Sequence, residues 1–140
     1  MPAGRPPQRI YFEDVQTNVP LETPAMTLTE THAALFASLA IDRPREAGLI
    51  PDLLPLCISS GLGWRVPQAP LVVLAFMGFE WRFLRGARVG DTIRSVSRTV
   101  AKRSLKEGGV VVEERTILNQ DDEVVQSGRL TLLVAKRPAA

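Results

Sequence analysis

Two carboxylates that lie close together are the side chains of this 140-residue chain that we consider first for proton transfer. Asp42 and Glu46 flank the segment Arg43-Pro44-Arg45. Two carboxyl groups can act as acid and base when one is held protonated while the other is ionised. The alternative interpretation is a solvated loop in which the neighbouring arginines are local ion partners. We keep Asp42 and Glu46 as the candidate catalytic pair.

His32 and Cys57 are the next side chains with reactive chemistry. His32 is the only histidine of the chain, and an imidazole exchanges protons near neutral pH. A lone histidine in a first helical turn nevertheless more often has a structural role. Cys57 is the only cysteine, and a thiolate nucleophile needs a base partner that the sequence does not offer. We therefore expect a structural histidine and a buried cysteine that packs as a small apolar residue.

Three arginines and a group of small residues could contact a ligand. Arg82, Arg85 and Arg88 are spaced three residues apart, and guanidinium groups suit phosphate oxygens. Anion binding by these arginines competes with a simpler interpretation as solvated strand and turn residues. Alternation along a strand separates Arg82 from Arg85, so at most two of the three converge. The small residues, which would let a packed backbone or a ligand come close, are Ser59, Ser60 and Gly61.

Composition restricts the class of protein. The net charge is +2, and acidic residues are interspersed with the basic ones, whereas a nucleic-acid binder usually gathers basic residues in one stripe. A single cysteine excludes an internal disulfide, and no Cys/His cluster indicates a metal site. No apolar run approaches the roughly 20 residues that span a bilayer, and no secretory signal is visible. We expect a cytoplasmic protein with no nucleic-acid or membrane partner.

The first half of the chain predicts a tail and two helices. Residues 1–9 contain three prolines and are expected to form a flexible tail, followed by a single domain over residues 10–137. A short strand at 10–12 and an extended segment at 21–28 lead to a helix that starts after the N-cap Thr29 and ends at Asp42-Arg43-Pro44. Its apolar stripe comprises His32, Leu35, Phe36 and Leu39. A second helix over residues 51–64 is apolar on most sides and should be buried.

The second half predicts four long strands. Val, Phe, Trp and alternating patterns mark residues 71–84, 92–102, 109–119 and 123–135, with turn signals between them. The short connections favour an antiparallel meander. One apolar helix with little polar surface must then be wrapped by the sheet, which is an α+β architecture and describes a hotdog fold. The aromatic stripe expected in the core, or partly at a dimer seam, comprises Phe76, Met77, Phe79, Trp81 and Phe83.

A resemblance to a known family follows from four segments. Residues 77–93, MGFEWRFLRGARVGDTI, resemble the strand and the Gly-Asp-Thr turn of the MaoC-like dehydratase family. Residues 118–125 resemble its later hairpin, residues 11–14 its opening, and residues 27–30 the start of its first helix. The resemblance implies a hotdog fold that pairs into a dimer, with the site between the subunits. It also implies an acyl-CoA thioester as the ligand and reversible hydration of a 2-enoyl thioester as the reaction.

The catalytic motif of that family is altered in this chain. The family carries Asp-x-Asn-Pro-x-His after its first helix. If Pro44 occupies the proline position, Ile41 occupies the aspartate position and Glu46 the histidine position. If Asp42 is taken as the aspartate instead, no histidine follows. The segment from Pro44 to the second helix is also shorter than in the family, which shortens the roof of the acyl pocket.

The resemblance assigns roles to the remaining candidates. The backbone N–H groups of Asp52 and Leu53, at the start of the central helix, would polarise the thioester carbonyl, because backbone donors do not depend on side-chain identity. Arg82 and Arg85 would bind coenzyme A phosphates, and residues 59–61 would contact the substrate. No separate cofactor is expected. Two alternatives remain open: a non-catalytic hotdog subunit that pairs with an active hydratase subunit, and an acyl-CoA thioesterase that uses Glu46 or Asp42 as base.

Overall fold

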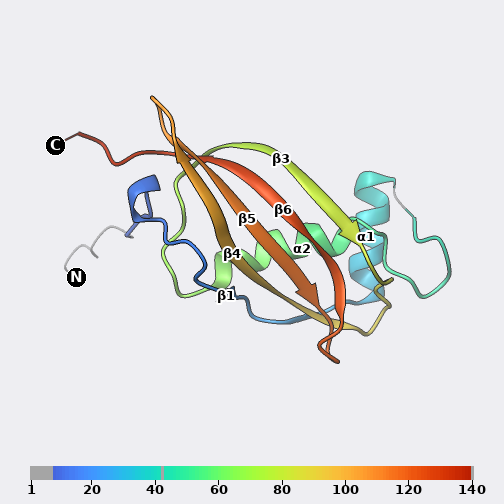
Figure 1. The fold of residues 1–140 in the computed structure, drawn as a ribbon. Coiled ribbons are helices and arrows are strands. Elements are labelled where there is room, and N and C mark those ends of the chain that lie inside the picture. Colours follow the sequence, from blue (N-terminus) through green and yellow to red (C-terminus); the bar gives the residue numbers. More distant parts are fainter. Residues whose placement is uncertain (1–7, 42, 140) are drawn as a thin grey trace, which may run out of the picture.

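The computed structural model describes residues 8–41 and 43–139, so most of the expected tail and Asp42 lie outside the described residues. Figure 1 shows the elements along the chain. They are η1 (Phe12–Asp14), β1 (Leu21–Glu22), β2 (Met26–Thr27), α1 (Glu30–Ala40), α2 (Leu54–Leu62), η2 (Gly63–Arg65), β3 (Val73–Phe83), β4 (Thr92–Ser104), β5 (Gly109–Leu118) and β6 (Val124–Val134). Within this part of the chain, no helix is long and apolar enough to cross a membrane.

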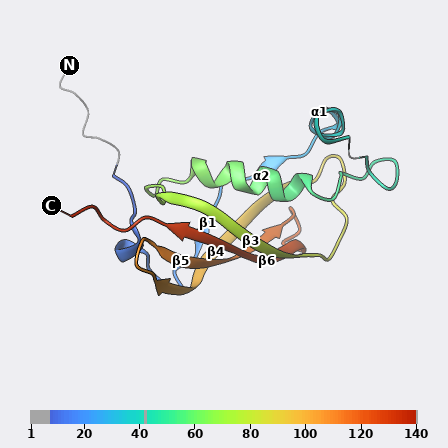
Figure 2. The same cartoon turned by 90° about the horizontal axis from the view of Figure 1, so that it is seen from above.

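One antiparallel sheet and one helix form the body of the protein. The sheet has six strands in the order β1-β4-β5-β6-β3, and β2 pairs with β4 beside this path. The helix α2 lies along one face of the sheet, and α1 lies beyond one end of α2 (Figures 1 and 2). The expected α+β class and hotdog fold are therefore confirmed.

The strand order differs from a simple meander. The strands β4, β5 and β6 follow one another as predicted, but β3 pairs with β6 and not with β4. The connection between β3 and β4 crosses the end of the sheet, where the N–H groups of Leu84 and Arg85 donate to the carbonyl of Val125 at 3.0 and 3.1 Å. The prediction that short connections join antiparallel neighbours was therefore correct for β4, β5 and β6. It was wrong for β3, because the connection from β3 to β4 crosses to the other side of β6 and β5.

The helix α1 begins where the sequence predicted it and presents a different face to the core. Thr29 is the N-cap, and its Oγ1 accepts the N–H of His32 at 3.3 Å. The helix ends at Ala40, two residues before the predicted stop at Asp42-Arg43-Pro44, since the next residue takes a left-handed φ of 54°. Ala33 and Phe36 pack against the core, whereas Leu35 and Leu39 are exposed, so the predicted stripe is not the buried face.

The helix α2 is shorter and less enclosed than predicted. It covers Leu54–Leu62, and its buried residues are Leu54, Pro55, Ser59 and Leu62. Cys57 is exposed, so the expectation of a buried cysteine was wrong. The reason is geometric: the sheet covers one side of the helix, and no described residue covers the opposite side. A helix that is apolar on most sides is therefore not fully buried within this single chain.

Two further expectations are corrected at the edges of the sheet. Residues 12–14 form the 3-10 turn η1 in place of a strand, because the Asp14 carboxylate accepts the N–H of Tyr11 at 3.1 Å and closes the turn. The aromatic stripe of β3 was expected in the core or partly at a dimer seam, and Phe76, Met77, Phe79 and Phe83 are about half exposed, so these four lie outside the core of the single chain. Because β3 is an edge strand, only one of its sides is paired.

Candidate functional site

The start of α2 is held against the sheet by proline and by apolar contacts. Pro51 and Pro55 are fully buried, and Ile50 and Leu54 belong to the main core cluster. The N–H of Leu54 donates to the carbonyl of Pro51 at 3.1 Å, which begins the helical turn. The N–H groups of Asp52 and Leu53 have no acceptor among the described residues. Such unpaired donors give a helix start a partial positive charge.

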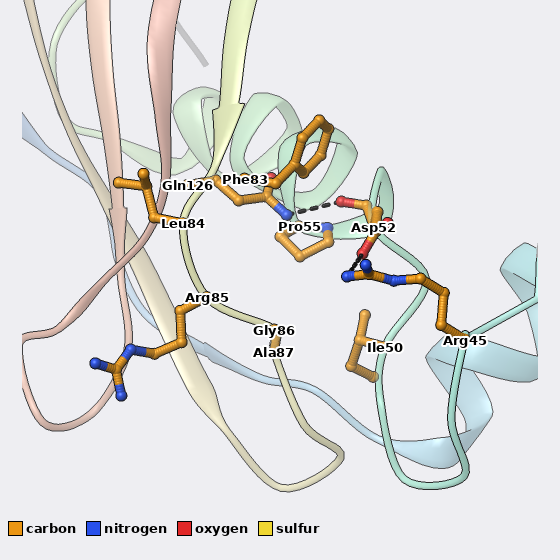
Figure 3. A pocket seen from close by; sticks show the side chains of 10 residues that line it. All are labelled: Arg45, Ile50, Asp52, Pro55, Phe83, Leu84, Arg85, Gly86, Ala87 and Gln126. Carbon is orange, nitrogen blue, oxygen red and sulfur yellow. Dashed lines mark hydrogen bonds and ion pairs between the residues drawn. The ribbon is translucent and has the colours of Figure 1, made fainter.

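A buried glutamine of β6 fixes the peptide at this start. Gln126 is 3% exposed, and its Nε2 donates to the carbonyl of Asp52 at 2.7 Å. Its Oε1 accepts the indole N–H of Trp81 at 2.8 Å, and Figure 3 shows the bond to Asp52. Gln126 was given no role by the sequence analysis. The sequence feature that could have identified it is a single amide side chain among the apolar residues of β6 that face inward.

A small cavity of about 110 Å³ lies between this helix start and the end of β3. Its lining includes Asp52, Arg45, Gln126 and Arg85. Arg45 reaches the Asp52 carboxylate at 3.3 Å, while Arg85 turns away from it (Figure 3). Arg85 pairs with Glu123 instead. Both ion pairs are substantially exposed, so each contributes little to stability. Their effect is to neutralise the two guanidinium charges nearest the helix start.

A larger depression of about 580 Å³ adjoins the cavity and contains Glu46. Its basic lining residues are Arg45, Arg85 and Arg88. Its acidic lining residues are Glu46, Asp91, Asp121 and Glu123. Three guanidinium groups therefore face four carboxylates, a balance that does not favour phosphate. Arg82 lies elsewhere: its strand neighbours Trp81 and Phe83 stand opposite Gly128 and Gln126 on the inner face, so Arg82 points to the outer face.

The small residues of α2 divide between the two sides of the helix. Ser59 is buried and Ser60 is exposed, yet both hydroxyl groups accept a hydrogen bond from Arg115 Nη1, at 3.2 and 3.1 Å. Gly61 is exposed, and a Cβ added there would meet no atom within 4 Å, so close packing does not require this glycine. The serines therefore connect the helix to β5, and the role of all three as ligand contacts stays a prediction.

Two charged residues under α2 were missed by the sequence analysis. Arg115 and Glu113 form an ion pair at 3.0 Å with side chains only 12% and 15% exposed. They lie between Val111 and Ile117 at two-residue spacing on the inner face of β5, a spacing that could have identified them. This largely buried guanidinium is tolerated because its donors are satisfied by a carboxylate and two hydroxyl groups. This cluster fixes how α2 lies on the sheet.

The other reactive side chains are not gathered at the helix start. His32 Nδ1 accepts the backbone N–H of Thr29 at 3.0 Å, so the expected structural role of this histidine agrees with its position in the cap of α1. Asp42 lies outside the described residues, and Glu46 is in the outer depression. The structure thus brings together Asp52, Leu53, Arg45 and Arg85, while the catalytic role of Asp42 and Glu46 stays a prediction.

Comparisons with known proteins agree with this architecture. No family model and no curated protein matches the chain. Among solved structures, a monoamine oxidase regulatory protein from Archaeoglobus is 28% identical, with a TM-score of 0.84 over 94% of this chain and 98% of that one. A MaoC domain protein dehydratase from Chloroflexus aurantiacus is 26% identical, with a TM-score of 0.82 over 97% of this chain and 43% of that one.

An (R)-hydratase from Pseudomonas aeruginosa shares the fold at 18% identity, with a TM-score of 0.74 over 91% of this chain and 87% of that one. The TM-scores show that these structures share the fold of the present chain and agree with the hotdog architecture. The chain is similar to a MaoC domain protein dehydratase and, in fold alone, to an (R)-hydratase.

Proposed function

We propose that this protein binds an acyl-CoA thioester at the start of α2, at the interface between two copies of the chain. The observation that carries the proposal is the pair of unpaired N–H groups at Asp52 and Leu53. A thioester carbonyl oxygen gains negative charge when a nucleophile adds to a conjugated enoyl group, and fixed amide donors stabilise that charge. These donors remain although the family's aspartate and histidine positions are altered in this chain.

A second copy of this chain is the partner that best fits the exposed apolar surface formed by β3 and α2. The edge strand β3 has unpaired backbone groups along one side, and its exposed Phe76, Met77 and Phe79 continue the exposed apolar side of α2. A soluble chain rarely leaves an apolar edge strand of this length uncovered. An isologous pair would join the two β3 edges and bring the two helix starts to the rims of one interface.

The reaction that fits this arrangement is the reversible hydration of a 2-enoyl thioester. A carboxylate takes a proton from water while the oxygen of that water bonds to C3. The double-bond electrons move towards the carbonyl oxygen, which the amides of α2 hold, and a carboxylic acid returns a proton to C2. Glu46 is the described carboxylate that we propose for one of these steps, and Asp42 is its proposed partner. The cytoplasmic location stays a prediction.

Hydration of crotonyl-CoA by the purified protein tests this activity. We expect loss of the enoyl absorbance, no release of free thiol, and a rate that falls at least about 100-fold in Glu46→Gln. Glu107→Gln changes an exposed glutamate in the hairpin between β4 and β5 and should leave the rate unchanged. Release of free thiol in place of hydration would identify a thioesterase, and no turnover at high protein concentration would contradict the hydratase.

A non-catalytic subunit is the second candidate, and one observation favours it. The single histidine of the chain caps α1, so this chain has no histidine for an aspartate–histidine pair. A partner hotdog subunit with an intact Asp-x-Asn-Pro-x-His motif would then supply the proton transfers. Crotonyl-CoA binding without turnover, followed by activity when such a partner is added, would establish this role. Turnover by the isolated chain would exclude it.

A further inference from the structure

Gln126 stands out because an amide occupies an apolar position of the sheet. On the inner face it lies opposite Ile117 of β5 and Phe83 of β3. An amide buried without partners costs several kcal/mol, so such a group persists only when its hydrogen bonds are made. Gln126 makes two hydrogen bonds. Its Oε1 accepts the indole N–H of Trp81 at 2.8 Å, and its Nε2 donates to the Asp52 carbonyl at 2.7 Å. The chain of bonds runs from β3 through β6 to the start of α2.

This chain of bonds determines where the amide of Leu53 points. In a trans peptide, the C=O and the N–H of the same plane point in opposite directions. The Asp52 carbonyl points to Gln126 and therefore towards the sheet. The N–H of Leu53 belongs to the same peptide plane and points away from the sheet. Leu53 as a whole is 43% exposed, which agrees with an amide that faces the open side of α2 and not the interior of the molecule.

The other end of the chain of bonds is equally fixed. The ring of Trp81 lies over Gly128 on the neighbouring strand, and a Cβ at Gly128 would collide with Trp81 and with the carbonyl of Glu80. Trp81 also packs against the main core cluster. The indole N–H consequently has little freedom, and it holds the Gln126 amide in the orientation that directs Nε2 at Asp52.

We propose that Gln126 is a positioning residue that sets the thioester preference of the site by turning the Leu53 N–H outward. This inference rests on the proposed function, because it assumes that the amide meets a thioester carbonyl. Gln126 does not touch the thioester. It acts through the Asp52–Leu53 peptide, so its loss should affect ligands that have the carbonyl oxygen and spare ligands that lack it.

The test compares butyryl-CoA with S-butyl-CoA, a thioether of the same chain length without the carbonyl oxygen. Calorimetry of the full chain gives the ratio of the two dissociation constants. We expect the wild type to prefer the thioester, and Gln126→Leu to lose about five- to tenfold of that preference while its affinity for S-butyl-CoA is kept. Gln16→Leu, the same substitution at an exposed glutamine before β1, should leave both affinities unchanged.

Gln126→Glu supplies a second variant with a readout that a purely structural role would not move. A protonated glutamic acid can accept from Trp81 and donate to Asp52, whereas the carboxylate can only accept. The thioester preference of this variant should be near normal at about pH 5 and decline towards about pH 9, while the preference of the wild type stays level.

The outcomes separate the two ideas. If the wild type binds both ligands equally, the proposed function and this inference are both overturned. If the wild type prefers the thioester and both variants keep that preference at every pH, only the role of Gln126 is overturned.

Discussion

The two sides of α2 differ in what covers them. On the inner side, Leu54 and Leu62 are buried, and Leu54 joins Ile117 and Val125 in the main core cluster. On the outer side, Leu53 before the helix and Trp64 of η2 after it are exposed, together with aromatic residues of the strand β3. Both sides are apolar, so composition does not distinguish them. The comparison teaches that the inner side stabilises the single chain, whereas the outer side is suited to association.

Phe79→Asp should give the largest effect, because it places a charge in the proposed dimer interface on the outer side. In a two-fold dimer the substitution occurs twice, and each unpaired buried charge costs about 3–5 kcal/mol. We expect sedimentation to change from dimer to monomer while circular dichroism stays that of a folded chain. Leu39→Asp places the same charge on the exposed side of α1 and should leave the dimer intact. A wild type that sediments as a monomer would contradict the proposed interface.

Ile117→Ala tests the inner side. Ile117 is fully buried, and truncation of such a side chain costs about 2–5 kcal/mol through lost burial and the cavity that remains. We expect the free energy of unfolding in urea to fall by this amount at matched protein concentration. Leu39→Ala removes a similar side chain that is 86% exposed and should change it by less than about 0.5 kcal/mol. Equal losses in both variants would remove the distinction between covered and open surfaces.

Gly128→Ala tests the contact between the edge strand β3 and its neighbour β6, where the covered side of the sheet meets the open side. The added methyl group would collide with the carbonyl of Glu80 and with Trp81, which forces the edge strand to move. Overpacking of this kind costs about 1–3 kcal/mol, and amide exchange should rise first in β3. Gly61→Ala is the matched control, since nothing lies within 4 Å of its new Cβ. Uniform exchange throughout the sheet would contradict a local effect.

Asp14→Asn should give the smallest effect, at the contact between η1 and the segment that follows β6. The hydrogen bond from Arg137 and, after it, that from the Tyr11 N–H lower the pKa of Asp14 below its ordinary value. A lowered folded-state pKa adds stability that is present above the unfolded pKa and is lost as pH falls through the folded value. The melting temperatures of wild type and variant should therefore differ slightly at neutral pH and converge below about pH 4. A difference that persists in acid would exclude this ion pair as its source.

Much of the fold could be predicted because its signals are local. Thr29 marks the start of α1 through its own hydroxyl group, and alternation marks the four long strands. The candidate site follows in part from the sequence, because the backbone amides at the start of α2 depend on the helix start alone, and their role stays a prediction. Gln126 and Arg115 were missed as site residues because their importance depends on partners 74 and about 56 positions away.

The sequence by itself determined the two helices, the four long strands, the α+β class and the absence of a histidine beyond the one in α1. These properties depend on periodicity, capping and composition, which act over a few residues. Only the tertiary structure decided that β3 pairs with β6, that one side of an apolar helix stays open, and that Gln126 turns the Asp52–Leu53 peptide. Each of these depends on which distant segments meet, and apolar side chains accept many neighbours with similar energy.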